Sequence, residues 1–213
     1  MNFVLKKDFS SFIKVIFFGI CMGGLCALLD LFPYNNIWTF SSFSGSVGFW
    51  AITGMIVLMQ SENWKLAGIN TFLYFAFMNS SFFFVYLLLP IANPRVTTFA
   101  QACAESLVWT IPSLICGVCA IIAYQAKKNN WFGIFTLSLP IGVLLSEFVS
   151  VLLAVFINHK YLFQTLVDLI GIILLFYLYK DKKNPIFLII TIIVGTGVLI
   201  LFNLITHHSI IYY

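Results

Sequence analysis

The stretch SLPIGVLLSEFVSVLLAVF, at 138–156, decides the class of this protein. It is long and apolar enough to cross a lipid bilayer, which takes about 20 predominantly apolar residues, yet it carries Glu147 near its middle. A second apolar stretch, FQTLVDLIGIILLFY at 163–177, carries Asp168. Because a carboxylate is costly inside a bilayer, these two acids are the first candidates for a functional role.

The whole chain has the composition of a polytopic membrane protein. Of its 213 residues, 62% are hydrophobic and only 8% are charged, whereas a soluble domain has roughly 25% charged residues. The net charge of +4 comes from short basic clusters between apolar stretches, so it indicates topology rather than nucleic-acid binding. We expect a single all-α transmembrane domain over 1–213, with the lipid bilayer as its surroundings and no nucleic-acid partner.

Seven transmembrane helices are predicted, separated by loops rich in Pro, Asn and charged residues. They cover roughly 11–32, 43–60, 66–89, 106–124, 131–157, 161–179 and 186–206. If the N-terminus is inside, nine lysines fall on the inner side, and only Arg95 and Lys160 fall on the outer side. This positive-inside bias predicts an inner N-terminus and an outer C-terminus.

An internal repeat is a candidate feature of the architecture. The segment 124–144 matches 179–199 at ten positions without gaps. The match would be explained by one leading helix followed by three similar two-helix hairpins, at 43–89, 106–157 and 161–206. Repeats of this kind recur in transporters, although apolar segments also match one another by chance.

Glu147 and Asp168 are expected at similar depth in the bilayer. The outer turn between them is centred on 156–159, and each acid lies ten to eleven residues from that centre. At 1.5 Å per residue, both lie about 15 Å below the outer end of their helices, near the midplane. The short loop makes the two helices antiparallel neighbours, but the sequence does not fix whether the acids face each other.

Neutral polar residues reach the same depth, whereas no Lys or Arg does. Burying an ion there costs at least about 2.5–3.5 kcal/mol. Three arrangements lower this cost: protonated acids bonded to neutral groups, one proton shared by the pair, or a cation from solvent or substrate. We therefore predict a site for a small solute, cation or proton; the simpler alternative is a protonated acid that only joins helices. The predicted site residues are Glu147, Asp168, Asn79, Ser80, Ser81 and Ser113.

Two stripes of small residues, spaced four apart, predict close helix packing. We expect both to pack within the chain, and the alternative for the stripe on the first helix is a partner subunit. The stripes are Gly19, Gly23 and Ala27, and Ser138, Gly142, Ser146 and Ser150.

The sequence contains no motif for catalysis, cofactor binding or metal binding. It lacks a glycine-rich phosphate loop, H-E-x-x-H and G-x-S-x-G. The pair Cys116 and Cys119 falls in the middle of an apolar helix, where cysteines act as small packing residues. We expect no enzymatic activity, no cofactor and no metal site.

Three segments carry a resemblance to a known family. SGSVGFWAITG (44–54), AGINTFLYF (67–75) and LLSEF (144–148) resemble a family of small bacterial integral membrane proteins of unknown activity. The resemblance implies a multi-pass protein of the bacterial cytoplasmic (inner) membrane. By size and helix count alone, the chain is also similar to the substrate-binding subunits of energy-coupling-factor importers. The positions that carry the family resemblance are Ser46, Gly48, Trp50, Gly54, Ala67, Gly68, Trp109, Gly117 and Glu147.

Together these features predict a membrane protein that binds or transports a small solute. The movement would be linked to a proton or cation through Glu147 and Asp168. The protein would act alone or with a membrane or ATPase partner subunit. The alternative is a non-transporting interaction subunit with an immunity, assembly or regulatory role.

Overall fold

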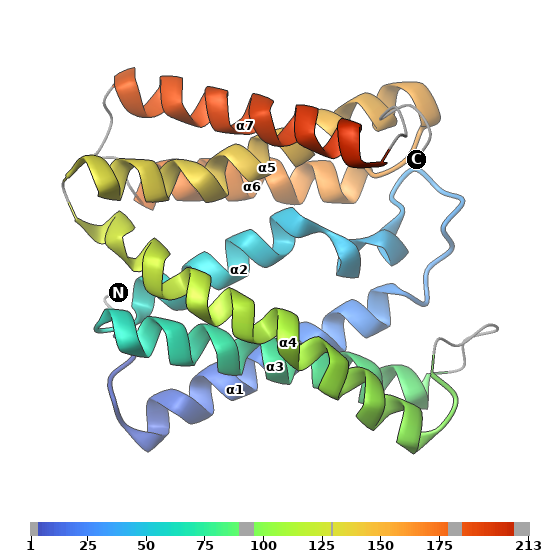
Figure 1. Cartoon of the computed structure of the whole chain (residues 1–213). Helices are drawn as coiled ribbons and strands as arrows, with labels where there is room; N and C mark the ends of the chain where they lie inside the picture. Colours follow the sequence, from blue (N-terminus) through green and yellow to red (C-terminus); the bar gives the residue numbers. More distant parts are fainter. Residues whose placement is uncertain (1–3, 90–95, 129, 179–184, 207–213) are drawn as a thin grey trace. The chain divides into compact units, whose positions relative to one another are not determined.

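The computed structural model of the chain describes residues 4–89, 96–128, 130–178 and 185–206. Seven α-helices and two short 3-10 helices make up most of this described part (Figure 1). Each of the seven predicted apolar segments overlaps one α-helix, although α2 begins four residues later and α4 seven residues earlier than predicted. In chain order the elements are α1 (Phe9–Leu29), η1 (Phe40–Gly45), α2 (Val47–Gln60), α3 (Trp64–Leu88), α4 (Phe99–Ala123), η2 (Tyr124–Lys127), α5 (Trp131–Asn158), α6 (Leu162–Leu178) and α7 (Pro185–Thr206).

The described helices confirm the predicted all-α class and support a membrane location. Four of them are long and apolar enough to cross a membrane: α1, α3, α5, and α4 taken together with η2. The outer surface of α4 is lined with exposed aliphatic side chains, among them Leu107, Ile111 and Val118, which is typical of contact with lipid. The seven crossings and their sidedness remain predictions, and the C-terminal segment 207–213 lies outside the described residues.

Side-chain caps define where several helices begin. Asp8 accepts a hydrogen bond from the Ser11 N–H of α1 at 2.7 Å, and Asn130 accepts one from the Gly133 N–H of α5 at 2.7 Å. Thr98 forms a capping box with Gln101 at the start of α4. These caps satisfy N–H groups that have no partner within the first turn of a helix.

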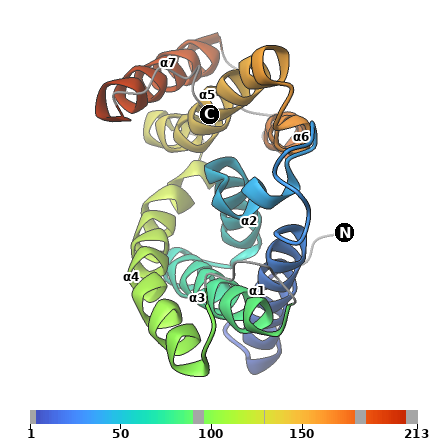
Figure 2. The same ribbon diagram turned by 90° about the vertical axis from the view of Figure 1, so that its right-hand side faces the viewer.

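The described helices form two compact units, of which the first comprises Met1–Leu31 and Gly54–Gln125. Within it, α3 lies between α1 and α4 (Figure 2). Gly19 and Gly23 bring α1 against the backbone of α3, and Gly68 of α3 meets Gly117 of α4. Ala27 is fully buried as well. The stripe on α1 therefore packs within this unit.

The second unit comprises Phe32–Thr53 and Ala126–Tyr213. Within it, α5 packs against both α6 and α7, and η1 packs against α6. Gly142 of α5 lies against Val194 and Gly195 of α7. The main packing partners are thus α1, α3 and α4 in one unit and α5, α6 and α7 in the other, while the three hairpin repeats remain a prediction.

The contact between α1 and α3 predicts opposite outcomes at two adjacent glycines. A Cβ atom at Gly23 would overlap the carbonyl oxygen of Met78 and would lie 3.0 Å from the backbone nitrogen of Phe82. At Gly24 the nearest atoms are side-chain atoms 3.9 Å away. We expect Gly23→Ala to lower the free energy of unfolding by about 1–3 kcal/mol, as overpacking does, and Gly24→Ala to preserve or slightly raise it. Thermal unfolding in mild detergent measures both, and equal stabilities would contradict the packing described.

Candidate functional site

The start of α2 is the local feature that builds the site. Ser46 caps this helix, because its Oγ accepts a hydrogen bond from the Phe49 N–H at 3.2 Å. The helix has 14 residues, which gives a length of about 21 Å, against roughly 30 Å for the hydrocarbon core of a bilayer. The apolar segment predicted as a span at 43–60 therefore contains a shorter α-helix, with η1 just before it.

Backbone hydrogen bonds attach the loop before η1 to the turn between α5 and α6. The Leu162 N–H donates to the carbonyl of Ile37 at 2.9 Å, and the Tyr161 N–H donates to Thr39 Oγ1 at 3.0 Å. Thr39 and Tyr161 both have positive φ angles, of 46° and 68°. Two residues in an unfavourable backbone conformation are joined here by this hydrogen bond, so the loop has a defined position on α6.

Aromatic packing continues this attachment down to the start of α2. The ring of Phe163, in the first turn of α6, lies 4.8 Å from the ring of Phe40 and 5.0 Å from that of Phe43, between centroids. Phe43 in turn packs on Phe49 of α2, at 4.5 Å. Phe43 and Phe49 are buried. The cluster therefore holds the first turn of α2 against α6.

Glu147 of α5 accepts hydrogen bonds from this first turn. Its Oε1 accepts from the Val47 N–H at 3.1 Å, and its Oε2 accepts from the Gly48 N–H. The Gln164 side chain of α6 donates to Oε1 at 2.6 Å, and the Ser46 side chain also hydrogen-bonds to the carboxylate. A carboxylate at a helix N-terminus is stabilised by the N–H groups and by the helix dipole. Glu147 thus completes the start of α2.

This contact lies well inside α5. Glu147 is eleven residues before Asn158, where α5 ends, and this corresponds to about 16 Å along the helix axis. The sequence-based expectation of about 15 Å uses the same rise per residue, and the depth of this acid in a bilayer stays a prediction. The start of α2 lies at the same level of the second unit, because its N–H groups reach the Glu147 carboxylate.

Asp168 of α6 has very different surroundings. Its side chain is 0% exposed, and neither carboxyl oxygen has a hydrogen-bond partner in the structure described. A Cβ atom added to Gly48 would lie 2.6 Å from Glu147 Oε2 and even closer to Asp168 Oδ1. The two acids therefore face the same glycine, with these oxygens within about 5 Å of each other, a separation at which two carboxylates resist being ionised together.

No basic side chain on the neighbouring helices can neutralise the pair. Within the bounds given above, α2, α5, α6 and α7 contain no Lys, Arg or His. The other atom close to Gly48 is a methyl group of Leu144, 3.0 Å from the same Cβ position, and Leu144 is itself fully buried. The pair is thus lined on one side by N–H donors and on the other by aliphatic groups.

Sequence reasoning missed Gln164 and the first turn of α2. Gln164 precedes Asp168 by four residues, so the two share one face of α6, and this spacing was the available signal. The register of the α5–α6 pair places Glu147 beside Gln164, one helical turn from Asp168. The small residues of SGSVG (44–48) let α2 approach the acids, but in the sequence they indicated only the family resemblance.

The remaining predicted site residues belong to the first unit. Asn79 donates from its amide to Ser113 Oγ at 3.2 Å, which joins α3 to α4. Ser80 donates to the carbonyl of Ala76 in its own helix. Ser81 donates to the carbonyl of Ile20 at 2.9 Å, which joins α3 to α1. Each of these groups has a structural hydrogen bond, and their part in ligand binding remains a prediction.

The stripe of small residues on α5 lies largely inside the second unit. Ser138, Gly142 and Ser146 are buried, and Ser150 is half-buried. The hydroxyl groups of Ser138 and Ser150 donate to the carbonyls of Ile134 and Ser146, each at 2.9 Å. Because these hydroxyl groups bond within α5 itself, the stripe presents compact surfaces to its neighbours, as expected for helix packing.

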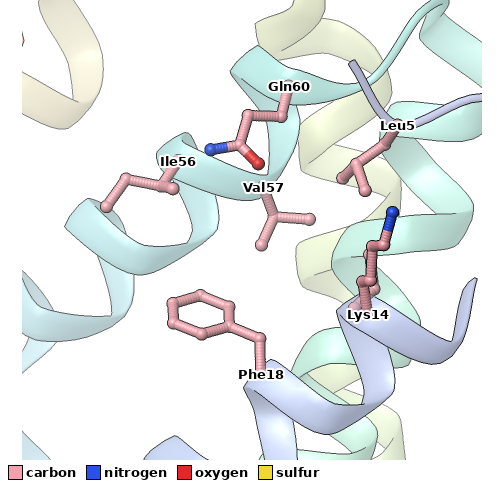
Figure 3. A pocket seen from close by; sticks show the side chains of 7 residues that line it. Leu5, Lys14, Phe18, Ile56, Val57 and Gln60 are labelled. Carbon is pink, nitrogen blue, oxygen red and sulfur yellow. The ribbon is translucent and has the colours of Figure 1, made fainter. Parts of the chain in front are cut away.

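A separate cavity of about 200 Å³ lies in the first unit. Phe18 and Lys14 of α1 face α2 across it (Figure 3). The lining is apolar apart from Lys14 and Gln60, and it consists of Leu5, Lys14, Val15, Phe18, Ile56, Val57 and Gln60. It contains no carboxylate, so its chemistry differs from that of the acid pair.

Comparisons of the chain with known protein families, with curated proteins and with solved structures find no match.

The unequal surroundings of the two acids predict unequal effects of neutralising them. Glu147→Gln removes the negative charge from the N-terminus of α2, and we expect it to lower the free energy of unfolding by about 0.5–2 kcal/mol. Asp168→Asn removes no hydrogen bond that the structure shows, and we expect stability equal to or above that of the unmodified protein. Thermal unfolding in mild detergent compares the two variants. A larger loss for Asp168→Asn than for Glu147→Gln would contradict the site geometry.

Proposed function

We propose that this protein binds and transports a small solute across the bacterial cytoplasmic membrane, and that movement is linked to a proton or cation at the pair Glu147 and Asp168. The observation that carries the proposal is the carboxyl group of Asp168, which is fully buried without a hydrogen-bond partner beside a second acid. Seven crossings with an inner N-terminus, and a role for Asn79, Ser80, Ser81 and Ser113 as neutral ligands, belong to the same proposal.

The surroundings of Asp168 favour function over helix joining. An acid retained only to join helices gains its stability from a hydrogen bond to a neighbouring helix. Asp168 makes no such bond in the described structure, and a buried polar group without a partner destabilises a protein by about 1–3 kcal/mol. Ionisable residues are rare inside membranes because they are costly there, and those that occur are typical of ion and proton pathways.

The short α2 supports transport independently. In many secondary transporters, interrupted helices place the positive end of a half-helix near the bilayer midplane, where it faces an anionic group of the substrate. Here the N-terminus of α2 faces Glu147, about 16 Å from the end of α5. Non-helical backbone such as the loop before α2 is tolerated at that depth where protein covers it, and Thr39, Phe43 and Ser46 are buried.

Two steps test this function. The full chain is purified in mild detergent, and small molecules extracted from it are compared by mass spectrometry with those from Glu147→Gln/Asp168→Asn. Each molecule that is lost from the double variant is then added to proteoliposomes that contain the pH indicator pyranine. We expect at least one of them to acidify the lumen when the unmodified protein is present, or to accumulate in the lumen under an imposed Na⁺ gradient, and the double variant to be inactive.

Glu105→Gln is the matched control, because it neutralises an acid on α4 in the other unit. We expect this control to retain the bound molecules and the acidification. Full transport by the double variant, with its fold intact, would show that the acid pair is not the transport site. An ATPase that co-purifies with the chain would identify the protein as the membrane subunit of an importer.

A further inference from the structure

The two acids of the pair differ in what already binds them. Glu147 accepts from the Val47 and Gly48 N–H groups and from the Gln164 amide, and it also bonds to the Ser46 side chain. All of these groups favour a carboxylate over a neutral acid. Asp168 accepts from none of them and is completely enclosed. The fixed negative charge of the pair therefore belongs to Glu147.

The donors around Glu147 also bear on which ion the pair takes. A metal ion beside Glu147 would face the N–H groups of Val47 and Gly48 and the positive end of the α2 dipole. Among the buried side-chain oxygens beside Glu147 in the described residues, the two without a hydrogen-bond partner are those of Asp168, whereas hard cations such as Ca²⁺ take six or more oxygen ligands. A proton needs a single oxygen, and it removes the negative charge from Asp168.

We propose that the coupled ion is a proton, that Asp168 carries it, and that Glu147 remains ionised beside it. Loading adds one proton from water to an Asp168 oxygen, and release returns that proton to water, while Glu147 keeps its charge throughout. Release leaves two carboxylates within about 5 Å of each other, which is unfavourable unless a solute or a change in structure separates them. The transport role of this proton rests on the function proposed above; its location does not.

No other titratable group competes for the proton at the pair. On α2, α5 and α7 the only ionisable side chain is Glu147, and on α6 Tyr177 accompanies Asp168. Tyr177 is more than two helical turns from Asp168, at about 13 Å along α6, and it is 67% exposed. A protonated carboxyl group buried in the second unit can therefore be assigned to one of two residues.

Infrared spectroscopy of the full chain in lipid vesicles at neutral pH locates this proton. A protonated carboxyl group has a C=O stretching band that ionised carboxylates lack, and ¹³C in that carboxyl group shifts the band. We expect such a band in the unmodified protein, shifted by ¹³C-carboxyl aspartate, unshifted by ¹³C-carboxyl glutamate, and lost in Asp168→Asn. Glu105→Gln, a control outside the pair, should keep it.

Two results would overturn the proposal. A band that shifts with labelled glutamate would place the proton on Glu147, and the absence of any such band would mean that both acids are ionised and that a cation other than a proton balances them. Neither result alone would refute the proposed transport function, which is tested separately. That function of the pair is refuted if Glu147→Gln/Asp168→Asn shows the same solute-driven acidification as the unmodified protein, while the infrared band of the unmodified protein still depends on Asp168.

Discussion

The hydrogen bonds between Glu147 and the first turn of α2 are the interaction on which the rest of the second unit depends. They determine where α2 begins, because a chain buried at this depth must satisfy its first N–H groups within the protein. They also hold α5 and α6 in register through Gln164. Because these donors bind Glu147, the neighbouring Asp168 has no hydrogen-bond donor. The candidate site therefore depends on the different surroundings of the two acids, and not only on their presence.

Glycine at position 48 is the second constraint, since both carboxyl groups approach it. Any side chain there would displace the ends of Glu147 and Asp168, whereas Gly45, three residues earlier, has open space around it. The close approach of α2 to the acids thus follows from a single missing Cβ atom. Missing Cβ atoms also allow a close contact in the first unit, where Gly19 and Gly23 bring α1 against the backbone of α3.

The sequence was sufficient to predict the helices and to select the two acids as candidate site residues. It did not predict which groups each acid contacts. Hydropathy and loop residues locate every described α-helix within a few residues, apart from the starts of α2 and α4, because each apolar segment must satisfy its own backbone in lipid. The start of α2 was missed because the predicted span begins at Phe43, which belongs to η1. The Ser46 cap and the hydrogen bond from Tyr161 to Thr39 show where the two helices separate. Gln164 was missed because side-chain rotation around α5 and α6 depends on packing that hydropathy does not encode. The part of Asn79 and Ser113 in ligand binding stays a prediction, and their hydrogen bond to each other depends on the same packing.

Calorimetric binding of the co-purified solute, performed in two buffers of different ionisation enthalpy, tests the central claim most directly. If solute binding is linked to a proton on Asp168, the measured enthalpy of binding will differ between the buffers for the unmodified protein. For Asp168→Asn the account predicts that this difference disappears. An enthalpy that is independent of buffer in the unmodified protein, or a dependence that survives in Asp168→Asn, would contradict the account.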